Sequence, residues 1–119
     1  MNWSKDCGYD AAQKRVFHST ARARLRRLAA ELGLEPGSYD LRSNQGGIPV
    51  SGEITLHHEQ VYVQVSQGFG PGVLIRTCRG RRDFTGGPNS FAELALLDDV
   101  PALAGRVRML VPALRRVAA

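Results

Sequence analysis

The stretch EITLHHEQVYVQVS, residues 53–66, decides the fold. Each of its halves alternates apolar with polar residues, which is the period of a β-strand with one buried face. Only a short turn around Glu59 separates the halves, so they are close enough to form an antiparallel hairpin. The residues expected to face the core are Ile54, Leu56, Val61, Val63 and Val65.

The opposite face of this hairpin would be polar. We expect it to carry Thr55, His57, Tyr62, Gln64 and Ser66, together with Arg42 from a neighbouring strand. Such a face tolerates water, and it also suits a partner or self-association, because Tyr and Arg are enriched where protein surfaces dock.

Further strands are predicted on both sides of the hairpin. Residues 38–43 alternate in the same way. Residues 73–79 form a fourth strand, and its buried face stays open because Val73 with Ile75 competes with Leu74 and Cys78. Residues 81–85 would add a short fifth strand or a hairpin return.

A helix is predicted before the sheet. Asp10 and Gln13 resemble a capping box, Gly33 is well placed to end the helix, and Pro36 prevents its resumption. Apolar residues recur every three or four positions between these signals. They are Phe17, Ala21, Leu25, Leu28 and Leu32.

Two helical segments are predicted after the sheet. Ser90 and Glu93 form another capping-box pattern, which predicts a short helix over residues 91–97. A last helix would start near Pro101 and be kinked or ended by Pro112. Its apolar stripe is Leu103, Val107, Leu110 and Leu114.

These elements predict a single α+β domain over residues 1–119, with residues 1–8 flexible. It would have an N-terminal helix and a meandering antiparallel sheet of four to five strands. One or two C-terminal helices would pack on one face of that sheet.

Composition favours a globular and basic protein. Of 119 residues, 43% are hydrophobic and 23% charged, which excludes wholesale disorder. The net charge of +5 permits nucleic acid, an anionic ligand or an acidic protein as partner. Apart from Lys5 and Lys14, all the basic side chains except the histidines are arginines. A GC-rich genome would produce this bias too, so a solvated basic surface without a partner is the alternative.

Two groups of arginines are candidate polyanion-binding residues. Arg15, Arg22 and Arg26 lie at spacings of seven and four, and therefore share one stripe of the first helix. The second group, in and before a Gly-containing turn, is Arg76, Arg79, Arg81 and Arg82. Because guanidinium groups bind phosphates with two parallel hydrogen bonds, the leading hypothesis is a binding module for nucleic acid or another polyanion.

Phe84 lies next to the second group of arginines. A nucleic-acid base could stack on its ring beside the arginines. We favour instead a Phe84 that is tucked into the core, because isolated aromatic residues usually pack there.

Two other classes of function remain open. The chain could be a protein–protein interaction module, or an inhibitor-like protein, that docks an acidic protein or forms a homodimer. Its interface candidates are Tyr62, Gln64 and Phe84. A small-ligand enzyme is the third possibility.

Motifs for catalysis, metals and cofactors are missing from the sequence. Cys7 and Cys78 stand alone, and His57 and His58 are adjacent in a strand, so they point to opposite faces and chelate one metal poorly. We therefore expect a non-enzymatic protein with no metal and no cofactor.

Three Gly-containing loops could cradle a phosphate, but turns are the favoured interpretation. They are residues 44–47, 68–72 and 86–87. No apolar stretch approaches the length of a membrane span, and the first eight residues lack the core of a secretion signal. The sequence thus predicts a cytoplasmic protein with free thiols and no membrane partner.

Overall fold

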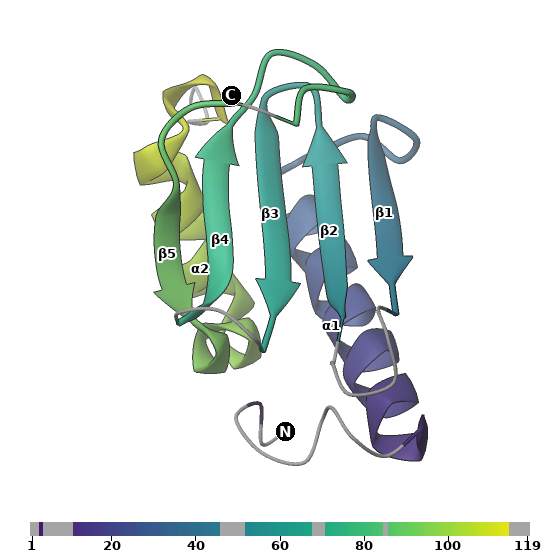
Figure 1. The fold of residues 1–119 in the computed structure, drawn as a ribbon. Helices are drawn as coiled ribbons and strands as arrows, with labels where there is room; N and C mark the ends of the chain where they lie inside the picture. Colours follow the sequence, from purple (N-terminus) through teal and green to yellow (C-terminus); the bar gives the residue numbers. More distant parts are fainter. Residues whose placement is uncertain (1–2, 4–10, 46–51, 68–70, 85, 115–119) are drawn as a thin grey trace.

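The computed structural model of the chain describes Trp3 and residues 11–45, 52–67, 71–84 and 86–114. Two α-helices and five strands make up most of this part of the chain (Figure 1). In chain order the elements are α1 (Ala11–Glu31), β1 (Tyr39–Asn44), β2 (Glu53–His58), β3 (Val61–Ser66), β4 (Gly72–Thr77), β5 (Ser90–Glu93), the 3₁₀ helix η1 (Leu94–Asp98), α2 (Val100–Leu110) and the 3₁₀ helix η2 (Pro112–Leu114).

The predicted α+β fold is confirmed. The strands form one sheet in the order β1-β2-β3-β4-β5, and every neighbouring pair is antiparallel. Both helices lie behind the sheet in Figure 1, where α1 crosses β1 and β2 and α2 lies behind β4 and β5. One face of the sheet is therefore covered by helices, and we call the other the outer face.

The core lies between this sheet and the helices. The expected core residues of the 53–66 hairpin are all fully buried. Val73 and Ile75 of β4 are buried as well, whereas Leu74 is half-buried. The side of β4 that carries Val73 and Ile75 therefore faces the core, a choice that the sequence left open. The predicted apolar stripe of α1 packs against these strands, and all five of its members are buried.

The first helix ends where the sequence predicts. Gly33 adopts a φ of 74°, and its N–H donates to the carbonyl oxygen of Ala30. The next amide, that of Leu34, donates to the carbonyl oxygen of Ala29. These two bonds form the Schellman motif, which needs a left-handed residue and therefore favours glycine. The capping box at the other end involves Asp10, which lies outside the described residues.

The prediction of a short helix over residues 91–97 is wrong. Ser90–Glu93 forms β5, which pairs with β4 and places Ala92 in the core opposite Val73. Only after this strand does the chain turn into η1. The free edge of β4 explains the difference, because its backbone groups gain hydrogen-bond partners that a local capping box cannot supply.

The strand proposed for residues 81–85 is also absent from the described part of that segment, residues 81–84, which forms turns and bends. The last helix, by contrast, follows the prediction. The side chain of Asp99 accepts a hydrogen bond from the amide of Ala102 at the start of α2, and the helix stops before Pro112. No helix in the described ranges is long and apolar enough to cross a membrane.

Trp3 joins the N-terminal segment to the core. Its side chain is buried and meets Phe17 edge to face, with ring centroids 6.1 Å apart. The indole N–H donates to Asp98 across 2.9 Å, and the carbonyl oxygen accepts from the side chain of Gln67 at 2.6 Å. Of the residues 1–8 that the sequence predicts to be flexible, Trp3 is the one that the structure describes.

We expect Trp3→Ala to lower the free energy of unfolding by about 3 kcal/mol, because it opens a cavity beside Phe17. Trp3→Phe keeps a ring in place and loses the hydrogen bond to Asp98, so it should cost about 1 kcal/mol. Urea denaturation followed by circular dichroism measures both values. An alanine variant as stable as the wild type would contradict this packing.

Candidate functional site on the outer sheet face

The outer face is organised in two rows of side chains that run across the strands. The strand pairing aligns Asp40, His57, Tyr62 and Arg76, which we call the His57 row. The next row towards the other end of the sheet, the Phe91 row, contains Arg42, Thr55, Gln64, Leu74 and Phe91. On β2 to β5 these residues alternate with buried core residues, and on β1 they alternate with Tyr39 and Leu41, which are partly buried against the core, so they point away from the helices.

A long connection between β4 and β5, residues 78–89, reaches across the end of this face. We call it the crossing loop. In Figure 1 it leaves the tip of β4, extends over the ends of β3 and β2, and returns to β5. Its Arg81 donates to the carbonyl oxygen of Gly37 at 2.9 Å and to the carboxylate of Asp40 at 2.6 Å. The loop is thereby attached to β1, the strand farthest from its own ends.

His57 fixes the middle of the crossing loop. Its ring is fully buried, and Nε2 lies 3.0 Å from the carbonyl oxygen of Gly80. Its Nδ1 lies 3.5 Å from the guanidinium of Arg42. A carbonyl only accepts and a guanidinium only donates, so the ring is neutral with its proton on Nε2. Burial lowers the pKa of His57, and the charges of Arg42 and Arg76 lower it further, against the opposing effects of Gly80 and Asp40.

Phe84 lies on top of His57 and is 57% exposed. The two rings meet edge to face with centroids 5.1 Å apart, and the guanidinium carbon of Arg42 lies 5.7 Å from the Phe84 centroid. The expectation that Phe84 packs into the core is therefore wrong. His57 and the backbone of Gly80 already fill the space beneath the loop, so Phe84 stays on the surface.

Tyr62 and Arg76 form a second aromatic–cation pair on the same face. The guanidinium carbon of Arg76 lies 4.1 Å from the Tyr62 ring centroid, which leaves Tyr62 only 8% exposed. The hydroxyl of Tyr62 donates to Gln64 across 2.9 Å. Of the three interface candidates, Tyr62 is thus covered, Gln64 is half-buried and Phe84 is accessible.

The two predicted arginine groups lie on different elements, and one member of each contacts β1, on opposite faces of the strand. Arg22 of α1 reaches the hydroxyl of Ser43 at 3.5 Å, and Arg81 of the crossing loop binds Asp40. Between these points lies Arg42, which also pairs with Asp40, at 2.9 Å. The hydrogen bond from Arg81 is the main cause that lowers the pKa of Asp40, so this carboxylate stays ionised between the two arginines.

The other candidate arginines are placed away from β1. Arg15 and Arg26 are exposed on α1, and Arg82 is exposed in the crossing loop. Arg79 is highly exposed and pairs with Asp83 at 3.7 Å, while Arg76 covers Tyr62. The structure therefore joins Arg81 through Asp40 to Arg42, which the sequence did not single out as an anion ligand, whereas Arg22 stays on the helix-facing side of β1.

Sequence analysis placed Arg42 and its neighbour His57 on the outer face but did not name them as site residues. Strand alternation places both on the outer face, which was the available signal. The crossing loop that gives them their contacts has no periodic pattern of its own, so their association with Phe84 had no sequence signal.

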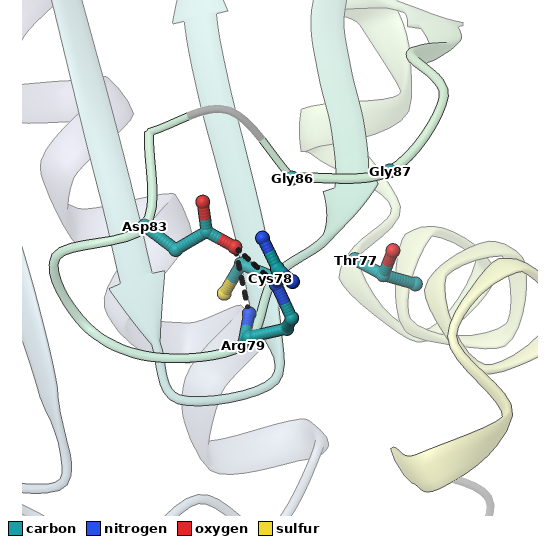
Figure 2. Close-up of a pocket in the computed structure, with 6 residues that line it drawn as sticks. All are labelled: Thr77, Cys78, Arg79, Asp83, Gly86 and Gly87. Carbon is teal, nitrogen blue, oxygen red and sulfur yellow. Dashed lines mark hydrogen bonds and ion pairs between the residues drawn. The ribbon is translucent and has the colours of Figure 1, made fainter.

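A pocket of about 370 Å³ lies beside the base of the crossing loop. Figure 2 shows its lining, in which the Asp83 carboxylate points towards Arg79 and two glycines pass the end of β4. The backbone amide of Arg79 donates to this carboxylate at 3.0 Å. The lining residues are Thr77, Cys78, Arg79, Asp83, Gly86 and Gly87.

In this pocket the Cys78 thiol is not activated as a nucleophile, and the Gly87 amide is not available to bind a phosphate. The Cys78 thiol donates to the carbonyl oxygen of His58 at 3.0 Å, and burial raises its pKa, which disfavours the thiolate. The amide of Gly87 donates to the carbonyl oxygen of Thr77 at 3.1 Å, and a Cβ at this glycine would collide with the Thr77 hydroxyl. Its backbone therefore serves the turn.

Metal-binding clusters are absent from the described ranges, in which no three His, Cys, Asp or Glu side chains gather closely enough to hold an ion. His57 and His58 indeed separate: His57 lies on the outer face, and His58 accepts a hydrogen bond from the backbone amide of Gln60.

A scan against protein-family models found no match for this chain, and searches of curated proteins and of solved structures found none either. We therefore infer function from the chemistry of the site alone.

The neutral state of His57 makes stability depend on pH. We expect the free energy of unfolding to decrease as the pH falls from 7.5 to 5. Histidines of the unfolded chain take up protons at about pH 6.5, whereas the lowered pKa of His57 keeps its ring neutral in the folded protein to a lower pH. Acid therefore stabilises the unfolded state relative to the folded state. The pKa of His58 is lowered by burial too and acts in the same direction. Urea denaturation at a series of pH values measures the effect.

His57→Gln is the matched variant, because its amide can still donate to Gly80 but does not titrate. It should show a weaker pH dependence than the wild type over this range, and His57→Gln/His58→Gln a weaker one still. An unchanged slope in His57→Gln would show that another group carries the pH dependence.

Proposed function

We propose that this protein binds single-stranded nucleic acid on its outer sheet face, with Phe84 as the platform on which a base stacks. One observation supports the proposal above all: an exposed aromatic ring rests on a buried, hydrogen-bonded imidazole and has a guanidinium beside it. Base–aromatic stacking with arginine contacts is the usual means of binding single strands.

The Phe84 platform is preorganised. The crossing loop is tied to β2 through Gly80 and to β1 through Arg81, and Phe84 itself contacts the His57 ring that holds Gly80. Little side-chain or loop entropy is then lost when a base stacks on the ring. A large apolar ring that is exposed and yet held in place favours a binding role over a packing role.

Arginines around the platform supply the positive charge for phosphates. Arg42 and Arg79 keep exposed guanidinium groups although each pairs with a carboxylate, and Arg82 is exposed in the same loop. Arg22 adds a cation at the β1 edge, on the helix-facing side of the strand. The net charge of +5 supports attraction of a polyanion over the whole molecule.

A single strand fits this surface better than a duplex. Stacking on Phe84 needs a base whose face is open, and bases in a duplex are stacked on one another. Both helices pack against the sheet through their apolar stripes. The α1 stripe of Arg15, Arg22 and Arg26 lies on the helical side of the sheet, so it would contact only the backbone phosphates of a strand that continues past the β1 edge, and these carry no sequence information.

The first test is fluorescence anisotropy with labelled DNA and RNA oligonucleotides of twelve thymidines or uridines. We expect binding at low salt that weakens as the salt concentration rises. The slope of log K against log salt concentration should be about −0.7 for each phosphate contact. Phe84→Leu should lower affinity about 5- to 150-fold, because it removes the stacking face, whereas Phe84→Tyr should retain binding. Arg42→Ala should lower both affinity and salt slope.

Arg27→Ala is the matched control, since it removes one exposed arginine of α1 that lies outside both predicted groups. Circular dichroism should show that all variants fold. Absence of binding at low ionic strength, or full affinity in Phe84→Leu, would overturn the proposal.

The helix stripe is tested separately by the triple variant Arg15→Ala/Arg22→Ala/Arg26→Ala. We expect a reduced salt slope and a moderate loss of affinity, because these residues would contact phosphates only. If the triple variant abolishes binding and Phe84→Leu leaves it intact, the nucleic acid binds to α1 and not to the sheet.

Self-association is the second candidate function. Phe84 and Phe91 are both exposed on the outer face, so a homodimer that used this face would bury them. Light scattering should then detect a dimer that Phe84→Asp dissociates. Phe84 is a better position than Tyr62 for introducing this charge, because Arg76 already covers Tyr62 within the monomer.

A further inference from the structure

Phe91 is a second accessible aromatic ring on the outer face. It is 42% exposed and lies on β5, at the far end of the row that begins with Arg42 on β1. Its strand neighbour Ala92 is buried, which places Phe91 on the same side of the sheet as Phe84. Its cross-strand partner Leu74 is half-buried and forms an apolar base beside it.

Arg106 brings a guanidinium to Phe91. This residue of α2 reaches the β5 edge and donates to the carbonyl oxygen of Phe91 at 2.8 Å. An arginine thus lies near each of these two aromatics: Arg42 approaches the ring of Phe84, and Arg106 binds the backbone carbonyl of Phe91. Arg76 lies on β4 between them, above Tyr62.

The spacing of the two rings suits a short oligonucleotide. Phe84 sits over His57 of β2, and Phe91 belongs to β5, three strands farther along the sheet. Three spacings of 4.7–4.9 Å give roughly 14 Å. Stacked nucleotides rise by about 3.4 Å each, so about four of them cover this distance, and fewer do when the strand is extended.

We infer that Phe91 and Arg106 form a second stacking subsite, so that a single-stranded nucleic acid runs across the strands from Phe84 to Phe91. Arg42, Arg76 and Arg106 then lie along its path and neutralise phosphates, which gives the surface the charge complementary to this ligand. The inference rests on the proposed function and extends it from one base to a segment of about four nucleotides.

Thymidine oligonucleotides of two, four, six and ten residues test the subsite by anisotropy. The dinucleotide is too short to reach both rings, so Phe91→Leu should bind it as the wild type does. For six residues, wild-type affinity should exceed that for the dimer by more than tenfold, and Phe91→Leu should lose 5-fold or more of that gain. Phe91→Tyr should keep the gain, whereas Phe84→Leu should weaken binding at every length.

Arg106 is examined with two variants, because Arg106→Ala also removes a hydrogen bond to β5. Arg106→Lys keeps the charge and should bind six residues within about threefold of the wild type, while Arg106→Ala should reduce both affinity and salt slope. Met109→Ala is the matched control, since this highly exposed apolar residue of α2 lies on the helical side of the sheet. Thermal unfolding verifies that each variant is folded.

The outcomes separate this inference from the proposal beneath it. If Phe84→Leu loses binding and Phe91→Leu matches the wild type at all lengths, the second subsite is wrong and the Phe84 platform stands. Equal losses in Phe91→Leu for two and for six residues would also overturn the inference, because they would make Phe91 a primary contact. If the wild-type protein binds none of the oligonucleotides, the proposed function itself fails.

Discussion

The hydrogen bond from Nε2 of His57 to the carbonyl oxygen of Gly80, 3.0 Å long, joins the crossing loop to the sheet. It requires a neutral imidazole, and burial of the ring favours that state by lowering its pKa. Phe84 rests on this ring and Arg42 approaches both. The exposed aromatic on the outer face thus rests on a buried side chain whose neutral form the packing favours.

Arginine has two distinct uses in this molecule. Arg76 lies over the Tyr62 ring and covers it, and Arg81 ties the crossing loop to Asp40, so both contribute to packing as much as to charge. Arg42 and Arg79 keep exposed guanidinium groups next to carboxylates that hold them in place. A basic composition alone does not separate these uses, since burial and pairing decide which arginines can meet a phosphate.

Local sequence signals predicted the strands of the hairpin and the first helix correctly, because tertiary contacts did not oppose them there. The alternation in residues 53–66 and the apolar spacing of the first helix gave the correct strands, faces and helix end. Ser90–Glu93 shows the opposite case, because a capping-box pattern was present and the free edge of β4 was the stronger determinant. In the same way, the sequence favoured a buried Phe84, but His57 and Gly80 fill the space beneath it in the structure.

By itself the sequence determined the α+β class, the antiparallel hairpin, the core residues and the basic charge, because each follows from periodicity or composition over short stretches of chain. Only the tertiary structure decided that Arg42 and Arg81 share the Asp40 carboxylate and that Phe84 and Phe91 share an accessible face. These contacts join residues far apart in the chain through a loop without a periodic pattern. Their geometry depends on how strands pair and on what space remains above the sheet.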